Sequence, residues 1–156
     1  MALFVNAVAD QRPYQIADYL LCEARERGEL LSNLKLQKLL YYADAWSLAL
    51  FDEELFPEAF QAWVHGPVLV SQYHRFKDYK WHPITTEIDC PELNPKLVLH
   101  LNEIIDVFGS EPAVALELMT HREKPWLDAR GDTPPTEPSN AKISKAVTKE
   151  FYRSLS

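Results

Sequence analysis

Apolar residues recur at every third or fourth position through most of the chain, which is the spacing of helices with one buried face. Proline and glycine divide this pattern, because Pro13 suits a first helical turn while Gly28 and Gly109 suit helix ends. The pattern predicts helices over about 13–27, 33–50, 68–79, 95–108 and 110–121, a short helix from Pro125, and a last helix capped by Ser139 or Asn140. Ser32 or Asn33 is expected to cap the second helix, and Ser110 the fifth.

The middle of the chain follows a different pattern. Phe60, Ala62 and Val64 alternate with other residues, which predicts a short strand. The segments 55–56 and 84–86 are candidates for further strands. In the stretch WVHGPV, residues 63–68, Gly66 permits a backbone conformation that residues with a Cβ avoid, and the following proline is expected to open the third helix. We therefore expect a mainly α fold: one compact domain over residues 1–156, with about five to six helices and a small β-element in the middle.

The second predicted helix is apolar on more than one side. Its main face carries a stripe that includes Leu36, Leu40 and Ala43, and the opposite side still carries apolar residues around Lys38. Two interpretations are open. The helix is central and covered on both sides, or the second stripe with Lys38 and Tyr42 belongs to a partner surface, where tyrosine is a frequent anchor.

The last predicted helix combines an apolar and a basic stripe. Its apolar residues recur at a spacing of four, and they are Ile143, Val147, Phe151 and Leu155. Its basic residues, which also share one side, are Lys142, Lys145, Lys149 and Arg153. Such a basic run is commonly a solvated face, and the alternative is contact with an acidic partner or nucleic acid.

Composition narrows the class of protein. The 156 residues are 47% hydrophobic and 25% charged, which suits a folded domain with a real core. The net charge of −7 disfavours nonspecific nucleic-acid binding, which depends on Lys and Arg at phosphates. No apolar run is long enough to span a membrane, and the start, MALFVNAVAD, lacks the basic region of a secretion signal. We expect a cytoplasmic protein with both cysteines, Cys22 and Cys90, as free thiols.

Candidate chemistry is sparse. The five histidines include no pair at the helical spacing of two metal ligands, and neither cysteine has the context of a nucleophile. The chain also lacks the phosphate-binding glycine motifs and the serine-nucleophile motif. We therefore expect no metal, no cofactor and no catalytic residue. His65 and His121 are the candidates for general bases, and for both of them a structural role competes with catalysis.

Three segments in fixed order carry a resemblance to a known family. They are NLKLQKLLYYADAW, FQAWVHGPVLVSQYHRFK and LMTHREKPWLDAR. Together they resemble the Panacea domain of SocA-like antitoxins, also known as phage-associated GepA proteins. The resemblance covers roughly residues 10–155. The ordered triple is specific, whereas any one segment alone is weak.

The resemblance implies a function based on contact rather than catalysis. Panacea proteins are antitoxins of type II toxin–antitoxin pairs, which neutralise a protein toxin encoded beside them. One member of the family instead delivers its toxin to a cytosolic protease. The expected partner is therefore a protein toxin, with a cytosolic protease as a second candidate and no nucleic acid or membrane. Neither the toxin nor the oligomeric state follows from the sequence.

The motif residues are the candidate site. Those expected to bind the partner are Lys35, Lys38, Tyr41, Tyr42 and Trp46. Those expected to build or support the motifs are Gln37, Trp63, His65, Gly66, Pro67, Tyr73, His121, Pro125 and Trp126. The alternative is a small enzyme or ligand-binding protein in which the two aromatic corners bring His65 and His121 to one pocket.

Overall fold

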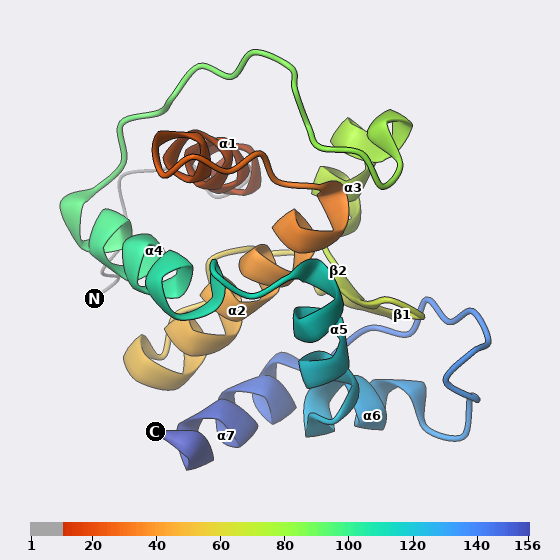
Figure 1. Cartoon of the computed structure of the whole chain (residues 1–156). Helices are drawn as coiled ribbons and strands as arrows, with labels where there is room; N and C mark the ends of the chain where they lie inside the picture. Colours follow the sequence, from red (N-terminus) through yellow and green to blue (C-terminus); the bar gives the residue numbers. More distant parts are fainter. Residues whose placement is uncertain (1–10) are drawn as a thin grey trace.

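One long helix forms the centre of the fold, and the other helices pack around it (Figure 1). The computed structural model describes residues 11–156. In this range the chain forms seven α-helices, one short 3-10 helix and one two-stranded sheet, which confirms the predicted mainly α class. The helices are α1 Arg12–Glu26, α2 Asn33–Phe51, α3 Val70–Phe76, α4 Pro95–Phe108, α5 Ala113–His121, α6 Lys124–Arg130 and α7 Lys145–Leu155, with the 3-10 turn η1 at Lys77–Tyr79.

The predicted starts of α1, α2 and α4 are confirmed, whereas the predicted cap Ser110 is wrong, because α5 begins at Ala113 after Pro112 and has no side-chain cap. The Ser32 side chain accepts a hydrogen bond from the backbone N–H of Lys35, and Pro13 and Pro95 occupy first turns of α1 and α4. No described helix is long and apolar enough to cross a membrane. The expectation that the start of the chain lacks a secretion signal concerns residues 1–10, which lie outside the described residues.

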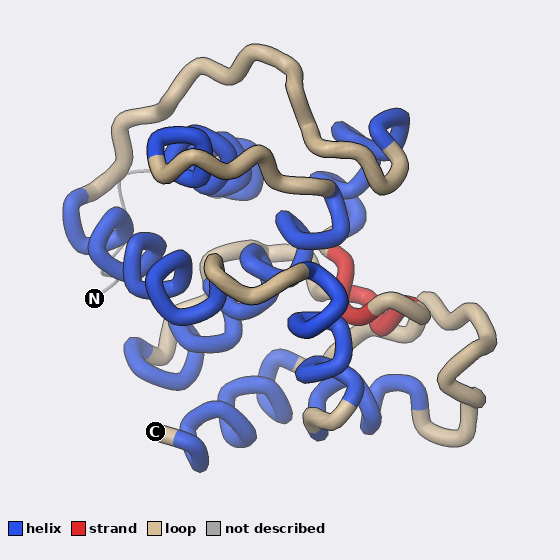
Figure 2. Tube along the Cα trace, in the orientation of Figure 1, coloured by secondary structure: helices blue, strands red, loops and turns tan. Residues whose placement is uncertain are grey.

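The strands form one hairpin at the edge of the helical array (Figure 2). Strand β1, Gln61–Trp63, pairs antiparallel with β2, Gly66–Val68, and Trp63 stands opposite Gly66. Two predictions are wrong here. Pro67 lies in β2 rather than at a helix start, and α3 begins only at Val70. The candidate strands at 55–56 and 84–86 do not form, although Leu55, Phe56 and Ile84 are buried in loops.

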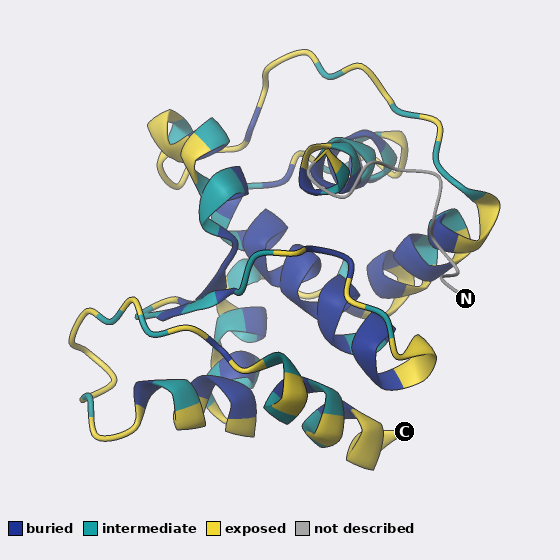
Figure 3. Cartoon of the chain, turned by 180° about the vertical axis from the view of Figure 1, so that it is seen from behind, coloured by how far each residue is buried: buried dark blue, intermediate teal, exposed yellow. Residues whose placement is uncertain are grey.

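Helix α2 is covered on all sides along most of its length. Helices α1 and α4 pack on one side of it, and α5 and α7 pack on the other (Figures 1 and 3). Every residue from Lys35 to Ala49 except Trp46 is buried. The interpretation of a central helix is therefore confirmed, and the exposed apolar residues of α2, Leu50 and Phe51, lie at its end, while Trp46 is half-buried.

Helix α7 starts later than the sequence predicts. Its cap is Ser144, whose side chain accepts from Val147 N, rather than Ser139 or Asn140. The segment before it runs extended beside β1: Ala62 N donates to Ala141 O, and Ile143 N donates to Phe60 O. The buried face of α7 carries Thr148 and Tyr152, so the predicted apolar stripe is wrong in part.

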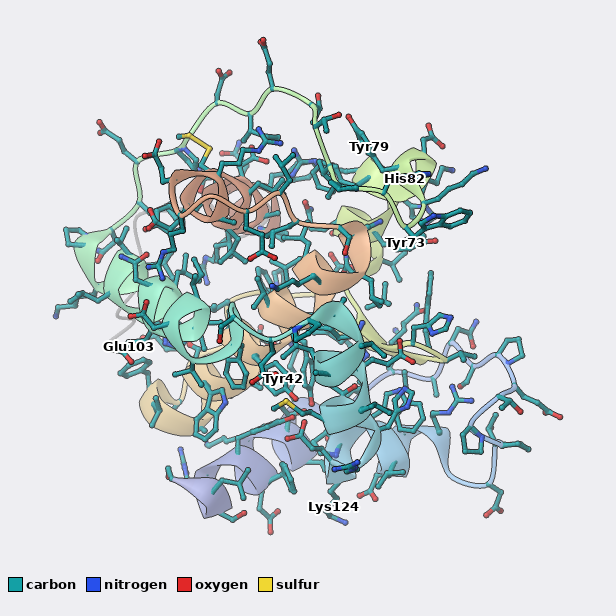
Figure 4. All side chains as sticks on the ribbon, viewed as in Figure 1. Tyr42, Tyr73, Tyr79, His82, Glu103 and Lys124 are labelled. Atoms are coloured by element: carbon teal, nitrogen blue, oxygen red, sulfur yellow. A yellow bond between two sulfur atoms is a disulfide. The ribbon has the colours of Figure 1, made fainter. Side chains whose placement is uncertain are left out.

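The two cysteines are not free thiols, because Cys22 and Cys90 form a disulfide. Cys22 lies on α1, and Cys90 belongs to residues 80–94, an extended segment that arches over α1 and that we call the strap (Figures 1 and 4). The strap is held at its start by Ile84 N, which donates to Leu31 O. The sequence indicated nothing of this pairing, because 68 positions separate the two cysteines.

Candidate functional site

The first motif supplies polar side chains that bind the backbone of the second motif. Gln37 Oε1 accepts from Leu69 N at 2.9 Å, and Lys38 Nζ donates to Pro67 O at 3.2 Å. The amide nitrogen of Gln37 donates to Asn33 Oδ1, and Asn33 in turn donates to Tyr73 O. The bonds to Leu69 N and Pro67 O satisfy buried backbone groups at the exit of the hairpin, and the bond to Tyr73 O extends the network to α3.

Gly66 is the point at which three segments of the motif triple meet. Its φ of +105° lies in the region that residues with a Cβ avoid. A Cβ on this residue would lie 2.5 Å from Cε of Lys38 and 2.9 Å from Oγ1 of Thr120. Glycine is therefore required here both by conformation and by space.

The ammonium group of Lys38 is enclosed by this junction. Its side chain has no exposed surface, and burial lowers the pKa of Lys38 to about 7 because a charged amine loses its hydration there. The nearby carboxylate of Glu117 on α5 acts against this shift. A buried lysine with a lowered pKa can serve as a base or a nucleophile, but the enclosed position of Lys38 leaves no room for a substrate.

The third motif holds the first strand of the hairpin. Trp126 Nε1 donates to Trp63 O at 2.9 Å, and Arg130 Nη1 donates to Ala62 O at 2.7 Å. The Arg130 guanidinium also lies over the Trp126 ring. Pro125 is buried in the first turn of α6. The three motifs thus form one connected junction between α2, the hairpin and α6.

The two candidate histidines occupy different environments. His65 lies on the hairpin turn with 71% of its side chain exposed, and its Nδ1 is 3.1 Å from Glu117 Oε1. His121 stacks on Trp126 with ring centroids 4.2 Å apart, and burial lowers the pKa of its imidazole. Neither the groove between α2 and α4 nor the smaller pocket beside α1, both described below, includes either histidine.

Tyr42 of the first motif shares the half-buried carboxylate of Glu123 with Tyr152 of α7. Tyr42 OH donates to Glu123 Oε1 at 2.7 Å, and Tyr152 OH donates to the same oxygen at 2.8 Å. Tyr152 OH also lies 3.1 Å from Tyr41 OH. Burial raises the pKa of the Glu123 carboxyl and of all three phenols. This network ties α2, α7 and the start of α6 together.

The remaining motif residues also pack inside the fold. Lys35 Nζ binds Glu29 at 2.6 Å and Gly109 O at 2.5 Å, so it joins the start of α2 to the end of α4. The Trp63 ring packs edge-on against Tyr73, which Figure 4 labels beside α3. Trp46 is half-buried and packs against Tyr152 on one side.

Three of the four basic residues predicted for the last helix bind α2 or the residue that follows it, although Arg153 also stays exposed. Lys145 Nζ binds Asp44, Lys149 Nζ binds Asp52, and Arg153 Nε donates to Ala49 O. Lys142 lies before α7 and is exposed. Three of the four cations therefore attach α7 to the second half of α2 and its C-cap Asp52.

An apolar groove lies between the second half of α2 and α4. Its volume is about 670 Å³. Its lining consists of Trp46, Leu50, Phe51, Lys96, Leu99, His100, Glu103, Ile104, Val107 and Phe108. Among these, Leu99 is 68% exposed and Val107 is 59% exposed. A smaller pocket of about 300 Å³ lies beside the end of α1 and is lined partly by Arg27, Glu29 and Asp106, which are already engaged in ion pairs.

Two charged side chains border the groove along α4. Lys96 lies in the first turn of the helix and Glu103 two turns later, both exposed. Figure 4 shows Glu103 on the outer side of α4, next to the end of α2. Neither residue forms an ion pair within the part of the chain that the structure describes.

A comparison with protein families identifies the family to which the chain belongs. The model of the antitoxin SocA-like Panacea domain matches residues 36–127, more than half of the chain. The chain belongs to the SocA-like Panacea family. Searches of curated proteins and of solved structures gave no match. Within residues 11–156 no cluster of three or more potential metal ligands occurs.

The Panacea match contains the whole of α4 and most of the motif junction, apart from Asn33 and Arg130. It begins in the first turn of α2 and ends within α6, so the groove lies entirely inside it. Sequence reasoning missed the groove, and it also missed Glu117 and Glu123. One signal was present: Leu99 and Val107, two helical turns apart on either side of Glu103, lie beside the main apolar stripe of α4 and give this helix additional apolar surface.

Proposed function

We propose that this protein is the antitoxin of a toxin–antitoxin pair, which binds a protein toxin in the cytoplasm and neutralises it by contact rather than by catalysis. The observation that carries the proposal is the family match over residues 36–127. The family is described as antitoxin SocA-like, and this description is the source of the proposed antitoxin role. The toxin is the partner that we expect the adjacent gene to encode.

The arrangement of the motif residues supports a binding function. The buried hydrogen bonds of Gln37, Lys38 and Trp126 stabilise the hairpin junction, and they leave the outer surface of the domain available for a partner. The net charge of −7 favours a basic toxin, since opposite charges speed association. A fall in the association rate with added salt is the expected sign of this attraction.

Burial changes how the five proposed partner-binding residues act. Lys35, Lys38, Tyr41 and Tyr42 have almost no exposed surface, so we propose that they hold the binding surface in place from beneath. Trp46 is half-buried and lines the groove, so we propose that it contacts the toxin directly. A variant such as Lys38→Glu with Tyr41→Ala then tests folding rather than contact, because it places a charge and a cavity in the core.

Co-expression tests the proposal. The adjacent gene is expressed from an inducible promoter with and without this chain, and growth is followed. Growth arrest that only co-expression relieves, with co-purification of the two proteins, is the expected result. If the adjacent product does not arrest growth, or if it does so equally in the presence of this chain, the proposed function is wrong.

A second measurement separates the two modes of neutralisation. Direct blocking leaves the toxin intact and bound, so its amount in the cell does not fall when the antitoxin is present. Delivery to a protease lowers the amount of toxin, and deletion of cytosolic proteases restores it. Immunoblots of a tagged toxin in both strains distinguish these modes.

A further inference from the structure

The apolar groove between α2 and α4 offers a binding surface that the motif junction does not use. We infer that this groove binds one amphipathic α-helix of a basic partner protein, with the apolar face of that helix turned inward. This inference rests on the proposed function in so far as the partner is the toxin. Beyond the proposed function, the inference names the groove as the binding surface and an amphipathic helix with basic residues as the segment of the partner that binds there.

The shape of the groove fits a helix. Its α4 wall is formed by residues 96, 99, 100, 103, 104, 107 and 108, which recur at three and four positions along the whole of α4. A helix laid along α4 meets this wall with side chains at i, i+3 or i+4, and i+7, which is the usual pattern of helix-in-groove recognition. The opposite wall is the end of α2, with Trp46, Leu50 and Phe51.

The exposed apolar area in the groove indicates a protein partner. Leu50, Leu99 and Val107 each keep more than half of their surface exposed, and all three line the groove. Contiguous apolar surface of this kind is uncommon on monomeric proteins outside interaction sites. Trp46 adds an aromatic ring with one polar atom, a combination that is enriched at binding hot spots.

Charge selects among the possible occupants. Two of the other charged groups near the ends of α2 and α4 are paired within the described chain: Asp52 binds Lys149, and Asp106 binds Arg27. Lys96, at the start of α4, lies at one end of the groove and forms no ion pair among the described residues.

Glu103 lies on the groove beside His100, and it acts against the lowering of the His100 pKa by burial. Glu103 forms no ion pair with a lysine or arginine of the described chain, so a cationic side chain on the bound helix can bind it. The net charge of −7 favours a basic partner over a second copy of this acidic chain.

Matched variants on α4 and α5 test the groove. Leu99→Ser with Val107→Ser makes the groove polar. Val114→Ser with Leu118→Ser makes the same chemical change on α5, outside the groove, at residues that are 61% and 50% exposed. All four side chains are largely exposed, so both variants are expected to fold, which circular dichroism and thermal melts check.

A synthetic helix serves as the probe. It is a peptide of roughly 18 residues with leucine at i, i+3, i+4 and i+7 and with lysine on the other face, labelled with a fluorophore. Its anisotropy is measured with the full chain. We expect about a tenfold or larger loss of affinity for the α4 variant and less than about a twofold loss for the α5 variant. Equal affinity of the wild-type chain and the α4 variant would overturn the inference.

A charge exchange tests the role of Glu103. Glu103→Lys is expected to weaken binding of the lysine-rich peptide severalfold and to reduce its dependence on salt. The control is Glu137→Lys in the loop between α6 and α7, which lies far from the groove (Figure 1) and changes the net charge equally. Equal losses for the two variants would show that only overall charge matters, and this result would overturn the assigned role of Glu103.

The product of the adjacent gene separates this inference from the proposed function. If it binds and is neutralised, hydrogen exchange on the complex should show protection in α4 and at the end of α2. Neutralisation with protection elsewhere overturns the groove but leaves the antitoxin function intact. If the product does not bind at all, the proposed function fails and the peptide experiment still decides the groove. A wild-type dimer that the α4 variant converts to a monomer would assign the groove to a second copy of the chain.

Discussion

The backbone of Gly66 lies directly against the side chain of Lys38. A Cβ on Gly66 would stand 2.5 Å from Lys38 Cε, closer than atoms of two residues approach in ordinary van der Waals contact. The Lys38 ammonium group in turn donates a hydrogen bond to Pro67 O, one residue further along β2. The first two motifs of the family thus fit each other, because the second motif has a glycine, Gly66, at the place where the first motif packs the long side chain of Lys38.

Replacement of Gly66 by alanine should destabilise the domain strongly. The new Cβ meets Lys38 and Thr120, and the φ of +105° is strained for any residue other than glycine. We expect a loss of about 2–4 kcal/mol in the free energy of unfolding, measured by urea denaturation.

Gly28→Ala is the matched control for this prediction. Gly28 also has a positive φ, of +89°, but its Cβ would meet nothing within 4 Å. It should therefore lose only the conformational part, about 1 kcal/mol. Similar losses for the two variants would mean that the contact with Lys38 contributes nothing.

The buried amine of Lys38 should make stability depend on pH. The pKa of the Lys38 ammonium group is about 10.5 in the unfolded chain, whereas burial lowers this pKa to about 7 in the folded chain. The unfolded state binds more protons between these values, so this group adds stability as pH rises from 7 towards 9.5. In the variant Lys38→Met, the free energy of unfolding should increase less between pH 7 and pH 9.5, and the difference from the wild-type chain should be on the order of a few kcal/mol. Urea unfolding of both proteins at pH 7 and pH 9.5 measures it, and parallel curves would contradict the assignment.

The ion pair between Lys145 and Asp44 should contribute more to stability than its neighbour on the same helix. Asp44 is almost fully buried and burial raises its pKa, so Lys145→Met leaves a buried carboxyl group without its cation. We expect a loss of about 3 kcal/mol. Lys149→Met is the control, because its partner Asp52 is largely exposed and the pair should contribute little. Thermal denaturation of the two variants should therefore separate them clearly.

Reduction of the Cys22–Cys90 disulfide should release the strap. A bridge between residues 68 positions apart stabilises a fold by up to about 4 kcal/mol in the chain-entropy model. The melting temperature of the wild-type chain should fall when a reductant is added, and limited proteolysis should then cut between residues 85 and 93. A Cys22→Ser, Cys90→Ser variant should show the lower melting temperature with or without reductant. A wild-type melting temperature that ignores the reductant would contradict the prediction.

Local signals accounted for much of the fold. The helices with a clear cap or a proline start, α1, α2 and α4, have the predicted extents, because their boundaries depend on neighbouring residues. Pro67 misled the prediction, since proline suits both a first helical turn and a short edge strand. Its place in β2 depends on pairing with Ala62 across the hairpin, a contact that no local pattern contains.

The candidate site was harder to predict for the same reason. The motif residues were recognised, but tyrosine and lysine on α2 looked like surface anchors because periodicity does not show what covers a helix. Tyr42 is buried because Glu123 and Tyr152, which are distant in sequence, close over it. The disulfide and the groove likewise depend on which segments meet in space.

The packing of α7 on α2 also constrains the order of events during synthesis. Tyr41 and Tyr152 touch across 111 positions of sequence, so the central helix cannot be enclosed until almost all of the described chain has left the ribosome. Until then the aromatic residues of α2 face water, in a state that chaperones and proteases recognise. The domain therefore completes its folding only after the chain is almost fully translated. A pulse-chase experiment can measure the delay between synthesis and the enclosure of α2.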